Sequence, residues 1–433
     1  MILTSAALYF LWRLGSAPAR ETSKLYQHLQ WRGLVKVRLK WVKNRGLDHI
    51  IDRETDLKAA CLLKEAIKRT STGFVTARSL SDWQKHLGLT VPVLRFIRRY
   101  PTLFHEFPHS RYASLPCFRL TDTALVLDAQ EQSIHEAQEA NTVERLSRVL
   151  MMFKSKAIPF KSLLPLKWDL GLPDSFAATI VPKYPDHFRI VKSQNGLSSL
   201  SLVRWRDEYA VSALQKSNET EELSDTYRQF KKGKTALAFP MSFPRGYGAQ
   251  NKVKAWMEDF QKLPYFSPYE DSSQIDPNSD LMEKRVVGVL HELLSLTIHK
   301  KTQRNYLRCL RQELNLPHKF TRIFTRYPGI FYLSLKCKTT TVAIKEGYQR
   351  GKLVDPHPLA QIREKYYHVM RSGVLYRGKG VHLIPEKEGL VNGEVGGIEE
   401  PDSEEEGVET SDECYEEDMS EVEVESEESS EEE

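Results

Sequence analysis

Signatures of catalysis and of bound metal are missing from this sequence. Its five cysteines stand at irregular spacing without a Cys-x-x-Cys pair, which argues against a zinc site and against a disulfide framework. The 433 residues contain no phosphate-binding Gly-x-x-x-x-Gly-Lys-Ser/Thr loop, no Gly-x-Gly-x-x-Gly and no nucleophile elbow. His291-Glu292 begins like a zinc-protease motif, but Ser295 stands where the second histidine is needed. We therefore expect no catalytic residue, no metal and no cofactor.

Long apolar runs are missing as well. The run Ala6–Leu14 is far shorter than the roughly 20 residues that cross a bilayer, and Arg13 interrupts it. The first acidic residue is Glu21, and serines surround the early arginines. Such an acid-poor start is typical of an organelle transit peptide, which we predict over residues 1–30. A secretory signal is the alternative, although no basic residue precedes the apolar run. We expect no membrane partner.

Basic residues are absent from the end of the chain. No Lys or Arg follows Lys387, whereas residues 388–433 carry 22 Asp and Glu. With almost no aromatic residues this tail cannot offset its ordering entropy, so we predict that it is disordered. The rest of the chain holds all 62 Lys and Arg against 36 acids, a net charge of +26. This excess predicts a polyanionic partner, and nucleic acid is the first candidate.

One motif occurs three times in this basic body. It consists of Leu-Gly-Leu or Leu-Asn-Leu, an apolar-periodic stretch, and a basic residue followed by Tyr-Pro-x-x-Phe. The copies span residues 87–104, 170–188 and 314–331. The proline ends a helix, because the residue before a proline is pushed out of the α region. The phenylalanines Phe104, Phe188 and Phe331 are expected to be buried.

The same patterns predict helices and hairpins around each copy. Helices are predicted over Glu54–Lys68, Ser79–His86, Thr142–Lys154, Lys252–Gln261 and Leu281–Leu314. Hairpins are predicted from Leu103–Phe107 with Cys117–Leu120, Phe188–Val191 with Leu200–Trp205, and Phe331–Leu335 with Thr340–Ile344.

The predicted fold class is α+β, mostly helical, with three irregular repeats of helices followed by a winged-helix-like β-hairpin. The repeat units span about residues 54–125, 142–210 and 281–350, and residues 211–280 form an insertion. The body as a whole runs from 34 to 385.

A basic segment near the start of the body is the first candidate RNA contact. In Lys36–Arg45, cations alternate with apolar residues, so an extended strand would place Lys36, Arg38 and Lys40 on one face. Such a cationic face predicts phosphate contacts, and a strand edge protected by charge is the alternative. The RNA-binding residues predicted in this segment are Lys36, Arg38, Lys40, Trp41, Lys43 and Arg45.

Two further places offer RNA contacts. The cations that precede the Tyr-Pro pairs are predicted to contact phosphates, whereas the Tyr-Pro pairs themselves are predicted to be packed helix stops. These cations are Arg98, Arg99, Lys183 and Arg326. In Phe243–Tyr247, aromatic side chains flank Arg245, so Arg245 and Tyr247 predict a platform on which unpaired bases stack. A packed loop fits that segment equally well.

Several ordered motifs together resemble the plant organelle RNA recognition domain over about residues 34–372. They are Lys36–Arg45 with Leu47-Asp48, Ile51, Arg53-Glu54 and Leu57, then Asp169–Pro173, Phe243–Tyr247, Leu263–Tyr265, Ser267–Tyr269, Leu290–Leu294 and Tyr327–Tyr332. The resemblance implies a protein that binds organellar RNA and promotes the splicing of group II introns, together with other splicing factors. It implies the mitochondrion, with the chloroplast as the alternative.

Two other functions stay open from the residues alone. Winged-helix modules often read DNA, so an organellar DNA-binding transcription or termination factor is the alternative. A thiol hydrolase would use one of the cysteines, but no local signature supports it.

Overall fold

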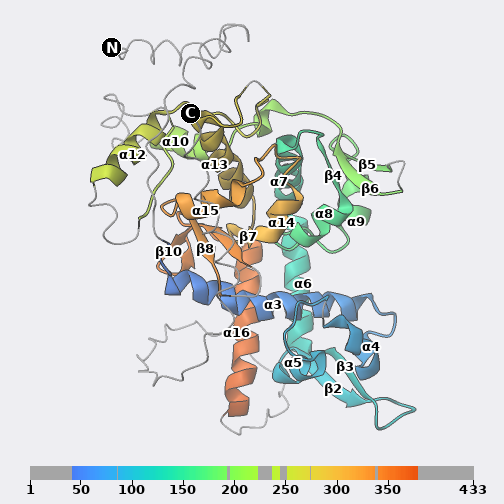
Figure 1. The fold of residues 1–433 in the computed structure, drawn as a ribbon. Coiled ribbons are helices and arrows are strands. Elements are labelled where there is room, and N and C mark those ends of the chain that lie inside the picture. The colour runs from blue at the N-terminus through green and yellow to red at the C-terminus, as the bar shows by residue number, and fades with distance from the viewer. Residues whose placement is uncertain are drawn as a thin grey trace, which may run out of the picture. The chain divides into compact units, whose positions relative to one another are not determined.

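The computed structural model describes residues 41–378, except residues 85, 193–195, 223–236, 244–250, 274 and 337–339. The predicted transit peptide, the acidic tail and the site residues Lys36, Arg38, Lys40, Arg245 and Tyr247 lie outside the described residues. The described part has the predicted α+β fold, with helices around small antiparallel sheets (Figure 1). None of its helices is long and apolar enough to cross a membrane.

The first unit pairs a long helix with a three-stranded sheet. Its elements are α3 (Arg45–Arg69), β1 (Phe74–Thr76), α4 (Ala77–Leu80), η1 (Ser81–Trp83), α5 (Val93–Arg99), β2 (Phe104–Pro108) and β3 (Pro116–Leu120). The strand order is β1-β3-β2, and all pairs are antiparallel. The predicted hairpin is therefore present, with one further strand at its edge.

The second unit follows the same order. It contains α6 (Asp122–Ala137), α7 (Glu139–Met152), β4 (Ala157–Pro159), α8 (Phe160–Leu163), η2 (Leu164–Leu166), α9 (Phe176–Lys183), β5 (Phe188–Lys192) and β6 (Ser198–Leu202). The sheet again places the last strand in the centre, in the order β4-β6-β5. The insertion that follows contributes η3 (Asp207–Tyr209), α10 (Ala213–Glu222) and α12 (Asn251–Lys262).

The third unit repeats this arrangement. Its elements are α13 (Asp280–Ser295), β7 (Lys301–Gln303), α14 (Arg304–Cys309), η4 (Phe320–Arg322), α15 (Ile323–Arg326), β8 (Phe331–Ser334) and β9 (Thr341–Ile344), in the strand order β7-β9-β8. A small hairpin of β10 (Tyr348–Gln349) and β11 (Lys352–Leu353) leads into α16 (Pro358–Gly378). Figure 1 shows α3 crossing α16, and these two helices are in contact.

The predicted helix Leu281–Leu314 is wrong beyond Ser295. Helix α13 ends there, and Lys300 turns the chain with a φ of 53° before strand β7. Gly73 and Lys156 hold the same left-handed conformation directly before β1 and β4. Apolar spacing cannot show such a turn when the residue is a lysine, because lysine rarely adopts a positive φ. The turn before β7 was therefore not foreseen.

Each Leu-x-Leu turn caps a short helix in the same way. The middle residue has a φ of 70°, 64° and 51° at Gly88, Gly171 and Asn315. The second leucine then donates its N–H to a carbonyl five residues back, which is the hydrogen bond of a Schellman motif. At Gly171 a side chain is also excluded by space, since a Cβ would lie 2.6 Å from Ile298 Cγ1.

Two apolar cores hold the units together. The second and third units share one core, which includes Phe188 and Phe331. The first unit has its own core around Phe104, and α16 closes this core with Leu359, Ile362, Tyr366 and Met370. The three motif phenylalanines are 3%, 2% and 1% exposed, so their predicted burial is confirmed.

Candidate nucleic-acid interface

The three Tyr-Pro corners have nearly identical backbones. Tyr100, Tyr184 and Tyr327 each terminate a helix with φ between −120° and −113° and ψ between 60° and 64°. Proline imposes this exit from the helix, because it disfavours α-helical angles at the residue before it. The predicted helix stops at these tyrosines are therefore confirmed.

Each corner is tied to a preceding helix of its own unit by one carboxylate. The tyrosine hydroxyl donates to Asp56, Glu139 or Glu283 at 2.5, 2.6 and 2.8 Å respectively. The basic residue before the tyrosine pairs with the same carboxylate. These pairs are Arg99–Asp56 at 3.6 Å, Lys183–Glu139 at 2.6 Å and Arg326–Glu283 at 2.7 Å. The basic-Tyr dipeptide is thus a structural clamp in all three units, a role that apolar spacing does not reveal.

The third corner is covered by the insertion. Trp256 and Phe260 of α12 lie 5.2 and 4.8 Å from Tyr327, measured between ring centroids. Burial and the Glu283 carboxylate raise the pKa of Tyr327 well above its ordinary value, so its hydroxyl stays a donor. The Arg326 side chain is 35% exposed, against 60% for Arg99 and 61% for Lys183. The first two corners are therefore more open to a large ligand.

Tyr327→Phe is expected to lower the free energy of unfolding by roughly 1.5–3 kcal/mol, because a buried hydrogen bond to a charged group is lost. Tyr184→Phe is the matched control at a more exposed corner, where we expect a loss of less than about 1 kcal/mol, since water can replace the hydroxyl. Urea denaturation of both variants measures the difference. Equal losses at the two corners would contradict the burial argument.

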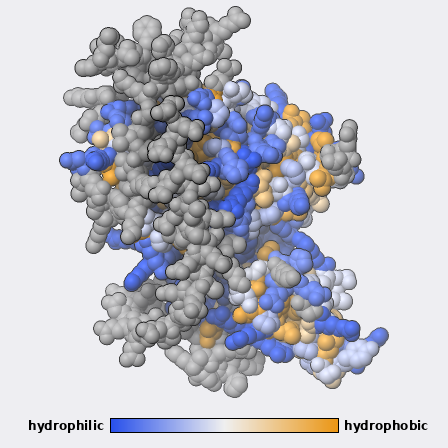
Figure 2. Space-filling model, in the orientation of Figure 1, coloured by the Kyte–Doolittle hydropathy of each residue, from blue (hydrophilic) through white to orange (hydrophobic). Residues whose placement is uncertain are grey.

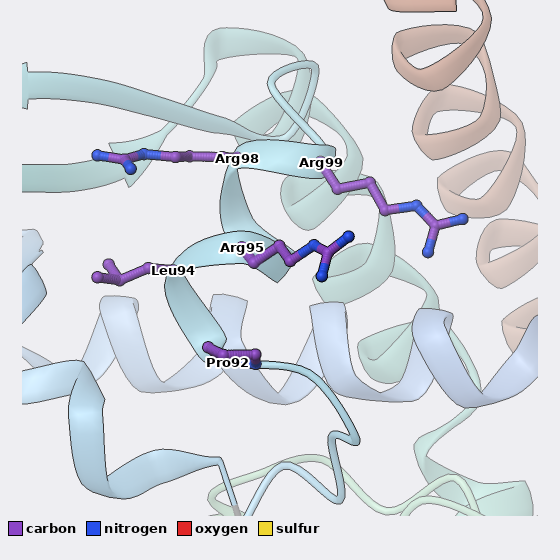
Figure 3. A pocket seen from close by; sticks show the side chains of 5 residues that line it. All are labelled: Pro92, Leu94, Arg95, Arg98 and Arg99. Atoms are coloured by element: carbon purple, nitrogen blue, oxygen red, sulfur yellow. The ribbon is translucent and has the colours of Figure 1, made fainter.

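Helix α5 presents three arginines on the first unit. Together with Pro92 and Leu94, Arg95, Arg98 and Arg99 line an open pocket of about 600 Å³. Figure 3 shows Arg95 and Arg99 pointing to one side of α5, whereas Arg98 points to the other. All three arginines are exposed. Residues 95 and 99 lie four apart, and this spacing places both guanidinium groups on one face of a helix.

The partners of these arginines differ. Arg98 forms a bidentate pair with Glu106 at 2.7 and 2.9 Å, and this hydrogen bonding raises the pKa of Arg98. Arg99 shares Asp56 with Tyr100. Arg95 makes no ion pair or hydrogen bond with any residue that the structure describes. A phosphate would therefore meet one unpaired guanidinium and two that are held in place by exposed carboxylates.

The neighbouring β2–β3 hairpin adds aromatic and basic side chains. Arg119 lies 5.6 Å from the Phe107 ring, and Tyr112 at the tip is 64% exposed. Arg111 is exposed beside it. Figure 2 shows hydrophilic and apolar residues interspersed over the first unit rather than one apolar patch. Exposed aromatics beside arginine suit stacking with unpaired bases.

The described end of the basic segment folds differently from a strand. Residues 41–44 belong to no sheet, and α3 begins at Arg45 after the N-cap Asn44. The Trp41 indole stacks on Tyr332 of the third unit and donates to the Leu333 carbonyl at 2.9 Å. Lys43 and Arg45 are exposed. Trp41 thus has a packing role in the structure, and its predicted RNA contact stays a prediction.

Two other clusters have structural explanations. Glu65, Asp128 and Glu131 converge, but the Lys64 ammonium pairs with all three at 2.9, 2.6 and 2.5 Å and supplies the positive charge itself. The Cys61 thiol is buried, which raises its pKa to about 12 and makes it a poor nucleophile.

The fold and its basic faces define a class of protein: a mostly helical α+β protein with cationic surfaces suited to a polyanion. Residues 42–375 match the family described as the plant organelle RNA recognition domain, and the chain belongs to this family.

Its curated relatives come from plants. The chain is 34% identical to "Protein WHAT'S THIS FACTOR 9, mitochondrial" of Arabidopsis thaliana, over 80% of this chain and 88% of the relative. It is 30% identical to "Protein WHAT'S THIS FACTOR 1, chloroplastic" of Zea mays, over 80% and 70%. It is 28% identical to "Protein ROOT PRIMORDIUM DEFECTIVE 1" of Arabidopsis thaliana, over 81% and 87%. No solved structure matches the chain, so the winged-helix likeness stays a prediction.

Proposed function

We propose that this protein binds organellar RNA and, without catalysis of its own, promotes the splicing of group II introns by holding the intron in a competent shape. The family and the charge of the body support RNA as the partner. The mitochondrion is the proposed location, because a relative that aligns over most of its length carries that word in its name. The chloroplast is the alternative, since other relatives are named chloroplastic.

The observation that carries the proposal is the group of exposed arginines on α5, with Arg95 and Arg99 on one side of the helix and Arg98 on the other. Three exposed arginines project from one short helix beside a hairpin with an exposed tyrosine. Phosphate contacts from the arginines would supply affinity without sequence information, and the aromatic side chain would reach bases. The core beneath α5 (Phe96, Ile97 and Tyr100) fixes the helix in place, so the arginines need little ordering on binding.

Replacing Arg95, Arg98 and Arg99 together with Gln should weaken binding to all RNAs alike and lower the salt slope by about 0.7 per lost single-strand contact. Folding should survive, since breaking exposed ion pairs costs little. Filter-binding titrations across salt measure both quantities. The matched control replaces Lys252, Lys254 and Lys262, three exposed cations of α12, with Gln and should leave the slope nearly unchanged.

An unchanged slope in the α5 variant would exclude α5 as the interface. The same titration on Lys36→Gln, Arg38→Gln and Lys40→Gln then decides whether the basic segment binds RNA instead. Competition by DNA of the same sequence tests the alternative of a DNA-binding transcription or termination factor, because only RNA carries the 2′-OH. Crosslinking in purified organelles, followed by sequencing of the attached RNA, would identify the intron.

A further inference from the structure

Five basic side chains from different parts of the fold interact electrostatically with one another, away from α5. They are His135 on α6, Arg145 on α7, Lys300 before β7, His357 before α16, and Arg363 on α16. Burial, and then the charges of Arg145, Arg363, Lys300 and His135, lower the pKa of His357 to about 3. Burial, and then Arg145, also lower the pKa of Lys300. The pKa of His135 is likewise lowered to about 4, chiefly by burial, so both histidines are neutral near pH 7 and the positive charge comes from Arg145, Lys300 and Arg363.

The two arginines of this cluster are buried without an acid. Arg145 is 8% exposed and Arg363 is 3% exposed, and neither forms an ion pair with a described residue. Among the described residues, Arg145 donates only to Thr142 Oγ1, at 3.3 Å. Arg363 donates to the Trp168 carbonyl at 3.0 Å, lies 3.5 Å from the Trp168 ring centroid and approaches His299 Nδ1 at 3.4 Å. A buried charge without a counter-charge is costly, so this arrangement calls for an explanation.

Three hydrogen-bond donors in the cluster lack acceptors. The Nε atoms of Arg145 and Arg363 and the Nε2 atom of His357 are buried and bond to no described residue. His357 Nδ1 accepts the N–H of Leu359 at 3.1 Å, so in the neutral ring the proton lies on Nε2. All three orphaned groups therefore donate. Buried polar atoms without partners are rare and often indicate a bound ion or water.

Five acids near the cluster have other partners. Glu131 binds Lys64 at 2.5 Å, and Asp169 accepts from Thr302 at 2.6 Å and lies 4.0 Å from Lys58. Glu144, beside Arg145, pairs with Arg148 at 3.4 Å and with Lys216 at 3.7 Å. Asp355, Glu292 and Glu346 act on Lys300. Glu292 binds Arg148, and Glu346 binds His291. The cluster thus keeps an excess of positive charge.

We propose that Arg145, Lys300, His357 and Arg363 bind a phosphate group at the junction of the second unit, the third unit and α16. Guanidinium groups match the geometry of phosphate oxygens, and orphaned donors supply charge-assisted hydrogen bonds. His135, Lys300 and His357 are only partly buried, so the cluster reaches the surface. The N-terminus of the 21-residue helix α16 begins beside His357 and adds partial positive charge. The phosphate comes either from the RNA backbone or from free phosphate in solution.

Inorganic phosphate tests the site on the full chain. Against sodium chloride of equal ionic strength, phosphate should raise the melting temperature by roughly 2 °C, because it binds the folded state alone. Arg145→Met should abolish this shift and weaken phosphate binding in calorimetry at least about tenfold, as expected for one charge-assisted contact. Without phosphate, Arg145→Met should melt no lower than wild type, since an unpaired buried charge is removed.

A second variant at the site and a control variant elsewhere complete the test. His357→Phe removes one donor but no permanent charge, so it should weaken phosphate binding severalfold even if Arg145→Met fails to fold. Arg204→Met, an exposed cation on the same protein, is the control and should behave like wild type. Equal melting temperatures of wild type in phosphate and chloride would overturn the proposal. So would a phosphate shift that Arg145→Met and His357→Phe both retain.

Competition between inorganic phosphate and RNA shows whether the bound phosphate belongs to the RNA backbone or to free phosphate. If the RNA backbone supplies it, inorganic phosphate should displace RNA from wild type, and Arg145→Met should bind RNA more weakly. If free phosphate supplies it, RNA affinity should stay the same in phosphate and in the variant, while the thermal shift persists. The melting and calorimetric measurements contain no RNA, so their outcome is independent of the RNA-binding function proposed for α5.

Discussion

Phe104→Ala, Phe188→Ala and Phe331→Ala are each expected to lower the free energy of unfolding by ~3–5 kcal/mol, the usual cost of emptying an aromatic core site. All three rings are nearly inaccessible and come directly after the Tyr-Pro corners. Phe331 lies 5.4 Å from Phe324 between ring centroids in an edge-on contact that alanine cannot make. Thermal and urea denaturation of each purified variant measure the effect.

The core to which each ring belongs predicts which part of the protein its alanine variant destabilises. Phe188 and Phe331 share one core, so their variants should loosen the second and third units together. Phe104 lies in the core closed by α16, so its variant should expose the first unit to protease while the shared core stays folded. Ile190→Ala, at a site that is 43% exposed on β5, is the control and should stay within about 0.5 kcal/mol of wild type. Wild-type stability of all three Phe variants would show that the motif lies on the surface.

Glu292→Ala is expected to cost about 3–5 kcal/mol, because it leaves a buried arginine without its partner. The Glu292 side chain is fully buried and accepts from Arg148 at 2.7 Å, from Tyr269 at 2.6 Å and from the Ala213 N–H at 2.6 Å. One carboxylate thus joins α7, α13 and the insertion. Urea denaturation measures the loss.

The same arginine offers a matched control. Glu144 pairs with Arg148 at 3.4 Å, four residues away on α7, but its side chain is 32% exposed. Glu144→Ala should therefore cost less than about 1 kcal/mol, since solvent screens that pair. Removing both charges in Glu292→Ala with Arg148→Met should recover part of the loss. If Glu144→Ala and Glu292→Ala cost the same, burial does not decide the strength of these pairs.

Local signals in the sequence predicted much of the secondary structure. The helix over Lys252–Gln261 lies within α12, and the three hairpins pair as expected because their apolar runs alternate around turn residues. The Tyr-Pro corners could be recognised because proline acts on its own neighbour. Strands β1, β4 and β7 were missed, since three residues are too few to show a period of two. Helix α16 was missed although Leu359, Ile362, Tyr366 and Met370 lie at helical spacing.

For the candidate site, too, some features could be predicted from the sequence and others could not. Charge counts predicted a basic body, and the Tyr-Pro motif directed attention to Arg98 and Arg99 but not to Arg95, because residue types and motifs need no coordinates. The clamp that joins Arg99, Lys183 and Arg326 to carboxylates could not be foreseen. Asp56, Glu139 and Glu283 lie 43 or 44 positions away from the cations they bind. Only folding brings such pairs together.

The sequence by itself determined the family, the net charge, the helix stops and the apolar residues that must be buried, because each depends on composition or on neighbours within a few positions. Tertiary structure alone decided which cations pair with a carboxylate and which remain without one. Arg326 pairs with Glu283 next to Tyr327, which α12 covers, and Arg95 is exposed on α5. The charges of Arg145 and Arg363 interact across more than 200 positions of chain. Charges interact through space over several ångströms, so their partners depend on packing and not on their order along the chain.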